Sequence, residues 1–518
     1  MSKDFNQKVF EESDAFEIPG ELLDTLFEEL PPEGVVNASN PSSMGMRRII
    51  TGLVLSCITF EFFALNHILP AIGAILLLMG FRNLHRENTW FFTSYICSVL
   101  RFIVMLPGLF LNATIYSKLL GGIWGRYIVI LSCILTVFML FCFWMATDQV
   151  QDKAGSEEKS FSAGALFLWY VLLLACSLIG FTGILTSILM ILAFIMIIKS
   201  LSSLSQLMET KGYLITAASV RISDRWLGYI LGGILISGLF FGFIFASSYQ
   251  MKWIPVTDTV DESDAAYLHL AELGYPKEQL NDLTEDEITL LRDADCVVVK
   301  KDEKNLSGME AYDSYEDGKL LNHYEPPTEL RLIHVAVRIA GDGSEGEFWR
   351  VIHHFAIDDV VRMKGTCNIK LWTLETMDGW DGTKDMSGRL LCKKQGVDMT
   401  ADYVLAEQVS YETNDFFGQS REDASCMFDF SLPKKASDRR GYVAYTSKQV
   451  EDGWILSSWV NFTSQIGYLQ YPVKTARQFT MEGIHLNDYP FSDIQSAIQF
   501  YVKDGTPDEE SLSEFGMD

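Results

Sequence analysis

Two adjacent histidines, His353 and His354, are the residues of this chain that most suggest metal binding or proton transfer. Imidazole binds transition metals and titrates near neutral pH. Both residues lie in a segment whose apolar residues alternate, which indicates a strand. Neighbours on a strand point to opposite faces, so the pair cannot chelate one ion together. We expect one to be a core histidine and the other to be exposed, and we predict no metal site here.

A glycine-rich segment, Gly341–Gly346, matches the pattern G-x-G-x-x-G. In dinucleotide-binding folds this pattern joins a strand to a helix, and its glycines let the backbone approach a pyrophosphate. Here the segment lies between two alternating stretches, and Asp342 and Glu345 would repel phosphate. We predict a loop of a β-hairpin and no cofactor.

An acidic cluster, Asp378, Asp381 and Asp385, offers the oxygen ligands that Ca²⁺ prefers. Its spacing does not match the EF-hand loop, so we predict a plain turn. The sequence contains no H-E-x-x-H, C-x-x-C, Walker A or G-x-S-x-G motif. We therefore assign no catalytic, cofactor-binding or metal-ligating residue.

Two charged residues, Glu61 and Arg101, lie within apolar segments. Each is about 13 residues from the expected cytoplasmic end of its segment, so the two have similar depth. A charge at mid-bilayer costs ~3 kcal/mol on insertion scales, and pairing reduces this cost. We predict an intramembrane ion pair that acts as a structural clasp, because a single pair makes no transport pathway.

The elements that would hold these residues begin with one apolar block, Ile49–Phe245, which contains segments long enough to cross a bilayer. Single spans are predicted for Trp90–Leu111, Tyr127–Ala146 and Trp226–Phe245. Ser162–Ile198 is predicted to form two short helices joined at Gly180–Gly183. The block as a whole indicates a multi-pass α-helical membrane bundle.

The first part of the block, Ile49–Phe81, is too long for one span and short for two. Pro70 and Gly73 are expected to break it near the middle. It would then form two short helices or a re-entrant hairpin, and both arrangements leave its ends on one side. The total is about seven crossings, or five plus the hairpin.

The last span contains two G-x-x-x-G patterns, Gly228 with Gly232 and Gly238 with Gly242. Such spacing lets two helices approach closely. Packing within the bundle is the simpler interpretation, and homodimerisation is the alternative.

The charge distribution predicts the orientation of the chain in the cell membrane. With the N-terminus in the cytoplasm, inside loops hold ten Lys and Arg residues and outside loops hold three. This bias favours a cytoplasmic N-terminus and an extracytoplasmic C-terminal domain. The inverted orientation stays open, because the loop at 148–160 has mixed charge. The net charge of −26 lies largely in the C-terminal half, which argues against nucleic acid as a partner.

The parts outside the block have distinct patterns. Residues 1–46 are acidic, with a predicted helix at Glu21–Leu30 that is either a solvated arm or a docking helix for a protein partner. Residues 251–300 are predicted to be a spacer of short helices, with a capping box at Thr284 and Glu287. Residues 301–518 are predicted to form the soluble domain.

The soluble domain is predicted to be a mainly antiparallel β-sandwich or barrel. Alternating apolar residues indicate strands at 330–339, 349–357 and 426–432. Two further strands, Tyr442–Val450 and Trp454–Phe462, are predicted to form a hairpin. A helix is expected near Ser492–Val502. Four cysteines in this half would permit two disulfides outside the cytoplasm.

Three functions are compatible with this architecture. The first is a membrane-anchored sensor or interaction protein, whose outer β-domain binds an envelope ligand or a protein. The second is a transporter or transporter subunit, supported by two apolar hairpins with the same orientation. The third is an extracytoplasmic enzyme that acts on glycans through paired carboxylates. The first is preferred, because the apolar segments contain few polar residues and no acid pair stands out.

Overall fold

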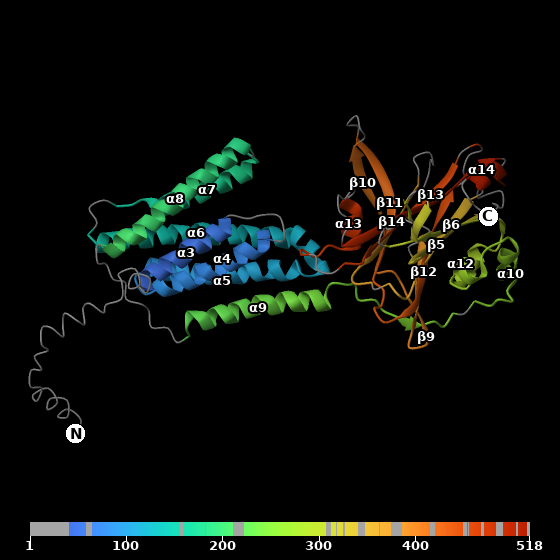
Figure 1. Cartoon of the computed structure of the whole chain (residues 1–518), viewed down its shortest axis with the longest axis horizontal. Coiled ribbons are helices and arrows are strands. Elements are labelled where there is room, and N and C mark those ends of the chain that lie inside the picture. The colour runs from blue at the N-terminus through green and yellow to red at the C-terminus, as the bar shows by residue number, and fades with distance from the viewer. Residues whose placement is uncertain are drawn as a thin grey trace, which may run out of the picture. The chain divides into compact units, whose positions relative to one another are not determined.

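The computed structural model describes residues 41–57, 65–155, 159–181, 183–210, 222–258, 260–306, 312–316, 319–324, 327–339, 348–361, 363–373, 386–414, 420–448, 453, 455–467, 471–482, 490–503 and 506–514. The chain divides into two compact units. One unit comprises Met1–Leu109 and Leu120–Ser237, and its described elements are helices. The other comprises Phe110–Leu119 and Gly238–Asp518 and is mainly β-structure (Figure 1).

Long apolar helices make up the N-terminal half of the chain, as predicted. They are α3 (Pro41–Cys57), α4 (Leu65–Leu84), α5 (Thr89–Leu111), α6 (Ile123–Lys153), α7 (Ser162–Ile179), α8 (Ile184–Thr210) and α9 (Asp224–Phe245), with a short 3₁₀ helix, η2 (Ile115–Gly121), before α6. Among the described residues, six helices, α4 to α9, are long and apolar enough to cross a membrane. The predicted turn between α7 and α8 is confirmed, and Gly180 there has a φ of +68°.

The predicted break at Pro70 and Gly73 is wrong, because both residues lie inside α4. The glycines of this region serve close helix packing instead. A Cβ atom at Gly52 of α3 would lie 2.7 Å from the carbonyl oxygen of Gly73, and one at Gly80 would lie 2.9 Å from that of Gly45. Gly45, the earlier residue of α3, meets Gly80, the later residue of α4, so the two helices are antiparallel. At these glycines their backbones are nearly in contact.

The close packing of α3 on α4 predicts that replacing glycine by alanine lowers the stability at Gly52 but not at Gly232. Gly52→Ala should destabilise the helical unit by about 1–3 kcal/mol, since the new methyl group overlaps α4. Gly232→Ala in α9 is the matched control, because no atom lies within 4 Å of its Cβ position. That control should be neutral or slightly stabilising. Thermal unfolding in detergent measures both, and equal midpoints for the two variants would contradict the close packing.

Ion pairs join several helix ends in the helical unit. Asp224, the first residue of α9, pairs with Arg48 of α3 and lies 3.6 Å from Arg82 near the end of α4. Lys153 at the end of α6 pairs with Glu87, just before α5, at 3.0 Å. Arg48, Arg82 and Asp224 therefore join α3, α4 and α9, and Lys153 with Glu87 joins the end of α6 to the start of α5.

Two antiparallel sheets form the β-rich unit, which confirms the predicted antiparallel β-domain. The first sheet has the order β1 (Ile254–Pro255), β9 (Val397–Ala401), β8 (Ser387–Lys394), β12 (Ser437–Lys448), β6 (Phe348–Ile357), β5 (Leu330–Ile339), β2 (Ala294–Lys304). The second has the order β10 (Leu405–Asn414), β11 (Ser420–Phe430), β7 (Cys367–Thr373), β13 (Ile455–Gln465), β14 (Phe491–Lys503), β15 (Thr506–Pro507). A separate hairpin consists of β3 (Tyr312–Glu316) and β4 (Lys319–Tyr324).

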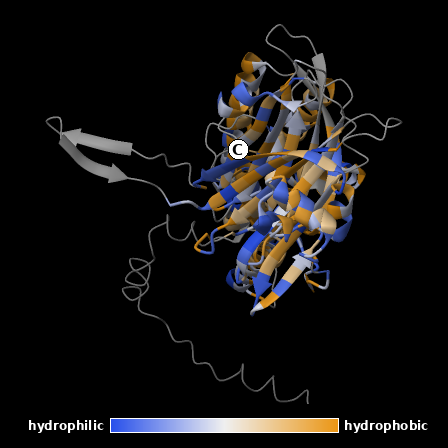
Figure 2. Cartoon of the chain, turned by 90° about the vertical axis from the view of Figure 1, so that its right-hand side faces the viewer, coloured by the Kyte–Doolittle hydropathy of each residue, from blue (hydrophilic) through white to orange (hydrophobic). Residues whose placement is uncertain are grey.

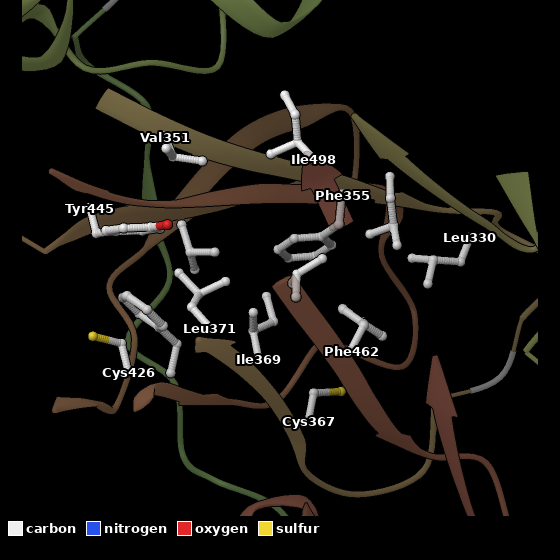
Figure 3. Close-up of a cluster of buried hydrophobic side chains, with 14 of the residues drawn as sticks. Leu330, Val351, Phe355, Cys367, Ile369, Leu371, Cys426, Tyr445, Phe462 and Ile498 are labelled. Atoms are coloured by element: carbon white, nitrogen blue, oxygen red, sulfur yellow. The ribbon is translucent and has the colours of Figure 1, made fainter. Parts of the chain in front are cut away.

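The core of this unit lies between the two sheets, as in a β-sandwich. Apolar and polar residues alternate along many strands, as the colouring in Figure 2 shows, so each strand turns one apolar face inward. Phe355 of the first sheet meets Phe462 of the second with ring centroids 5.3 Å apart. Leu330, Val351, Ile369 and other buried side chains fill the space around them (Figure 3).

Short helices cover the opposite face of the first sheet. Residues 251–300, expected to be a spacer, supply β1, most of β2 and three helices: α10 (Ala265–Glu272), α11 (Lys277–Leu280) and α12 (Glu285–Leu290). Leu270, Leu283 and Ile288 pack with Val335 and Ile352 of the sheet in a second apolar cluster. On the second sheet, α13 (Ala476–Glu482) stacks Phe479 on Phe491. The short helix α14 (Glu509–Glu514) follows β15.

Two local predictions about this unit are wrong. Tyr442–Val450 and Trp454–Phe462 do not form a hairpin, because β12 belongs to the first sheet and β13 to the second. The segment Ser492–Val502 is strand β14 and not a helix. Ile498, Phe500 and Val502 alternate into the core, and this period of two determines the strand. The four cysteines of this unit are free thiols, so the permitted disulfides do not form.

Candidate functional site

The first sheet presents a row of residues to the helices α10–α12. In the register of β5, β6 and β12, Arg331 is opposite Ala356, which is opposite Arg440. Neighbouring strands are about 4.8 Å apart, so the two arginine Cα atoms are about 10 Å apart with a methyl group between them. The small side chain of Ala356 leaves room between two guanidinium-bearing side chains.

A cavity of about 390 Å³ opens at this row. Its lining includes Arg331, Ala356 and Arg440 from the sheet and Glu278 and Asp282 from the helical layer. Two neighbouring cavities share lining residues with it. One of about 350 Å³ shares Arg331, and one of about 320 Å³ shares Arg440. We call the three together the sheet–helix groove.

One arginine of the groove is held by two carboxylates. The Nε of Arg440 donates to Oδ1 of Asp282 at 2.8 Å, and its Nη1 pairs with Asp438. Burial raises the pKa of Asp282 to about 6, although Arg440 opposes this shift. Asp438 has a φ of +52°, in the left-handed region. These contacts fix Arg440 and leave it little capacity for a ligand.

Arg331, by contrast, is exposed and has no ion-pair or hydrogen-bond partner among the described residues. It lies on the same face of the sheet as His354, which is opposite Ile333 on the neighbouring strand. A free guanidinium and a buried imidazole therefore line one cavity from adjacent strands.

The hydrogen bonds of His354 define its protonation. The hydroxyl of Tyr275 lies 2.8 Å from its Nε2, and its Nδ1 has no partner among the described residues. Burial raises the pKa of Tyr275 well above its usual value, so the phenol keeps its proton. Burial lowers the pKa of His354 to about 3, so the imidazole is neutral. If the phenol donates to Nε2, the imidazole proton is on Nδ1, which is then an unused donor.

A second polar feature lies between the two sheets. His334 and His353 face each other across β5 and β6 with their Nδ1 atoms 2.7 Å apart. His334 Nε2 is 2.8 Å from Ser496 Oγ, and His353 Nε2 is 2.8 Å from Ser458 Oγ. Ser496 in turn donates to Asp302. We call this series, from Asp302 to Ser458, the buried histidine chain.

The histidine prediction is therefore partly wrong. His353 and His354 face opposite sides of the sheet as expected, but both are buried. His353 is hydrogen-bonded to Ser458 between the two sheets, and His354 is hydrogen-bonded to Tyr275 beneath the short helices. Burial lowers the pKa of His334 and, more strongly, of His353, because the interior disfavours the charged ring. The pairing of His353 with His334 depends on the register of β5 with β6, which no local motif indicates.

The predicted glycine loop Gly341–Gly346 lies outside the described residues. Its flanking strands β5 and β6 pair directly and antiparallel, as a hairpin requires. The acidic cluster Asp378, Asp381 and Asp385 also lies outside the described residues. Within the described part of the chain, no three His, Cys, Asp or Glu side chains are grouped to hold a metal ion.

The four glycines of α9 have different surroundings. A Cβ atom at Gly228 would lie 2.8 Å from Met79, and one at Gly238 would lie 2.2 Å from the ring of Phe110. At Gly242 the nearest atom is the Cβ of Ala113, at 3.0 Å, whereas Gly232 has open space around it. Dimerisation through α9 stays a prediction.

The intramembrane pair also stays a prediction, because Glu61 lies outside the described residues and only Arg101, in α5, is described. If the two charges pair, Glu61→Ala and Arg101→Ala should each destabilise the bundle by leaving one charge alone. The double variant should then lose less than the sum of the single losses. Thermal stability in detergent measures all three, and purely additive losses would show that the two charges do not interact.

Comparisons with known proteins give no family for this chain. No protein-family model and no curated protein matches it. Among solved structures it is similar to the delta-toxin of Clostridium perfringens, with 9% sequence identity over 40% of this chain and 90% of the toxin chain. The TM-score is 0.17, and a likeness at that level supports no argument about function.

Proposed function

We propose that the chain is a membrane-anchored sensor or interaction protein of the cell membrane whose β-rich unit binds a small envelope ligand in the sheet–helix groove. One observation carries this proposal. The cavity of about 390 Å³ is lined by an exposed arginine, Arg331, that has no partner among the described residues, and by the buried histidine His354. Pockets of this size with a few polar groups are the usual sites of small ligands.

The proposed orientation places the N-terminus in the cytoplasm and the β-rich unit outside it. Within that unit, the backbone of Val473 donates to the carbonyl of Asn112 at 2.7 Å, and that of Ile115 to Ala246 at 2.9 Å. The segments that follow α5 and α9 are therefore bonded to each other and to the segment before α13. This supports one side of the membrane for all three, and the bias of Lys and Arg residues favours the outer side.

Binding is favoured over catalysis by the state of the acids in the groove. Glycan hydrolysis needs two carboxylates that can reach the substrate. Asp282 and Asp438 both contact Arg440, so Glu278 is the one acid in the described lining of the main cavity that has no such partner. The groove also lies in the β-rich unit and not among the apolar helices, which favours a ligand-binding role over transport.

The experiment uses the full chain in detergent and follows hydrogen exchange in peptides from β5 and β6 during thermal unfolding. The probes are the common α-amino acids, sugar acids and neutral sugars at millimolar concentration. At least one class should raise the unfolding midpoint, since a ligand that binds only the native state stabilises it. Ala356→Phe, which fills the cavity, should abolish the shift.

Val360→Phe is the matched control, because Val360 is 84% exposed and is not part of the groove lining. It should keep the full shift. The proposal is contradicted if no probe class raises the midpoint, or if Ala356→Phe retains the same shift as the control.

A further inference from the structure

We propose that the groove takes a small zwitterion of the amino-acid class, with its carboxylate at Arg331 and its ammonium group toward Glu278 and Asp438. This inference rests on the proposed function and names the ligand class of the same site. It follows from three properties of the cavity: an exposed arginine with no partner among the described residues, two accessible acids in the same lining, and a lining whose formal charge is negative.

Arg331 is suited to a carboxylate. Guanidinium binds carboxylate with two parallel hydrogen bonds. Arg331 is exposed, and Ala356, opposite it on β6, leaves its side chain room in the cavity. His354 is the diagonal neighbour of Arg331 on the same face, but its Nδ1 is buried, so the carboxylate is assigned to Arg331.

Two acids of the lining are available to the ammonium group. Glu278, on α11, is exposed, and Asp438, at the start of β12, has half of its side chain exposed. Both line the same cavity as Arg331, and Glu278 also lines the neighbouring cavity that shares Arg331. The ammonium group of an α-amino acid is one carbon away from its carboxylate, so a carboxylate at Arg331 brings the ammonium group toward these acids. Arg440, on β12, already pairs with Asp282 at 2.8 Å.

The charge balance of the lining decides between ligand classes. Three acids, Glu278, Asp282 and Asp438, face two arginines, Arg331 and Arg440. A phosphate or other dianion would be repelled by this balance, and a simple cation would be repelled by Arg331. A zwitterion matches both kinds of charge in the lining. The cavity volume of about 390 Å³ accommodates an amino acid of ordinary size.

Isothermal titration of the full chain in detergent at pH 7 tests the assignment. The probes are α-amino acids, their deaminated acids, their decarboxylated amines, glucuronate and inorganic phosphate. At least one amino acid should bind, and its acid and amine counterparts should bind at least ten-fold more weakly. Arg331→Gln should weaken amino-acid binding about 10- to 100-fold, because a charge-assisted contact is lost.

The control variant is Arg338→Gln, on the same strand. Arg338 is bonded to Asp295 and is absent from the groove lining, so its loss should leave the affinity unchanged. The unliganded midpoint of Arg331→Gln should equal that of the parent, since Arg331 has no partner among the described residues.

The outcomes separate this inference from the proposed function. Binding of glucuronate or phosphate without any amino acid would overturn the zwitterion class and leave a ligand-binding groove. Amino-acid binding that persists in Arg331→Gln would overturn the placement of the carboxylate. Failure of every probe, with no stabilisation in the unfolding experiment, would overturn both.

Discussion

Lowering the pH from 7 to 5 is expected to remove about 3–5 kcal/mol from the free energy of unfolding of the β-rich unit. The reason is the burial of three neutral histidines. His334, His353 and His354 are each no more than 2% exposed, and burial lowers the pKa of all three. In the unfolded chain the same side chains titrate near pH 6.5.

The sign of the effect follows from proton binding. Below pH 6.5 the unfolded chain binds protons that the folded unit does not, so the stability present above pH 6.5 is lost as the pH falls toward the folded pKa values. Each histidine contributes up to ~2 kcal/mol of loss at pH 5. Asp282 acts in the opposite direction, because its raised folded pKa of about 6 makes the folded state bind the proton first. It offsets ~1 kcal/mol of the loss.

Denaturant-dependent hydrogen exchange of β5 and β6 peptides, at pH 7 and pH 5, measures this loss in the full chain. His354→Phe should reduce the difference between the two pH values by ~2 kcal/mol. His269→Gln is the control, because His269 is exposed. It should leave the difference unchanged. Equal stability at both pH values would contradict the neutral, buried state of the histidines.

Arg350→Ala is expected to destabilise the β-rich unit by about 3–5 kcal/mol. Arg350 is 1% exposed and donates to both carboxylate oxygens of Glu287 on α12, at 2.6 and 3.0 Å. It also donates to Thr446 and Ser387. Removing the guanidinium leaves Glu287 as a buried, uncompensated charge between the helical layer and the sheet.

A second arginine provides a matched comparison. Arg338 on β5 makes the same two-pronged contact with Asp295, at 2.7 and 2.9 Å, but the Asp295 side chain is 40% exposed. Arg338→Ala should cost no more than about 1 kcal/mol. Replacing the buried pair together, Arg350→Met with Glu287→Leu, should recover most of the loss. Chemical denaturation followed by exchange in the α12 and β6 peptides measures each variant. Similar losses for the two single variants would contradict the role assigned to burial.

Elements with a clear period were predictable from the sequence. Helices α5, α7, α8 and α9 and strands β5, β6 and β11 lie where apolar length or alternation indicated them. Errors arose where a local signal competed with tertiary pairing. The residues before and after Gly453 resemble a hairpin, but β12 and β13 find partners in different sheets. Ile494, Ile498 and Tyr501 have helical spacing, but the segment pairs with β13 and forms the strand β14.

The site was less predictable, because it joins residues far apart in the chain. One signal was present: His334 shares a strand face with Leu330, Leu332 and Ala336, and a polar residue on an apolar face requires a buried partner. That partner, His353, depends on the register of β5 with β6. The contact of Gly52 with Gly73 was likewise hidden, because the spacing of glycines along one helix does not show which helix faces them.

We propose that a membrane-embedded helical bundle carries the ligand-binding β-rich unit outside the cytoplasm. Single engineered cysteines, labelled in intact cells with an impermeant maleimide, test this topology. Val360→Cys lies in the β-rich unit, and Lys159→Cys lies in the loop between α6 and α7. The parent chain, with its nine native thiols, sets the background. We expect Val360→Cys to be labelled in intact cells and Lys159→Cys only after lysis. Labelling of Lys159→Cys in intact cells and of Val360→Cys only after lysis would overturn the topology.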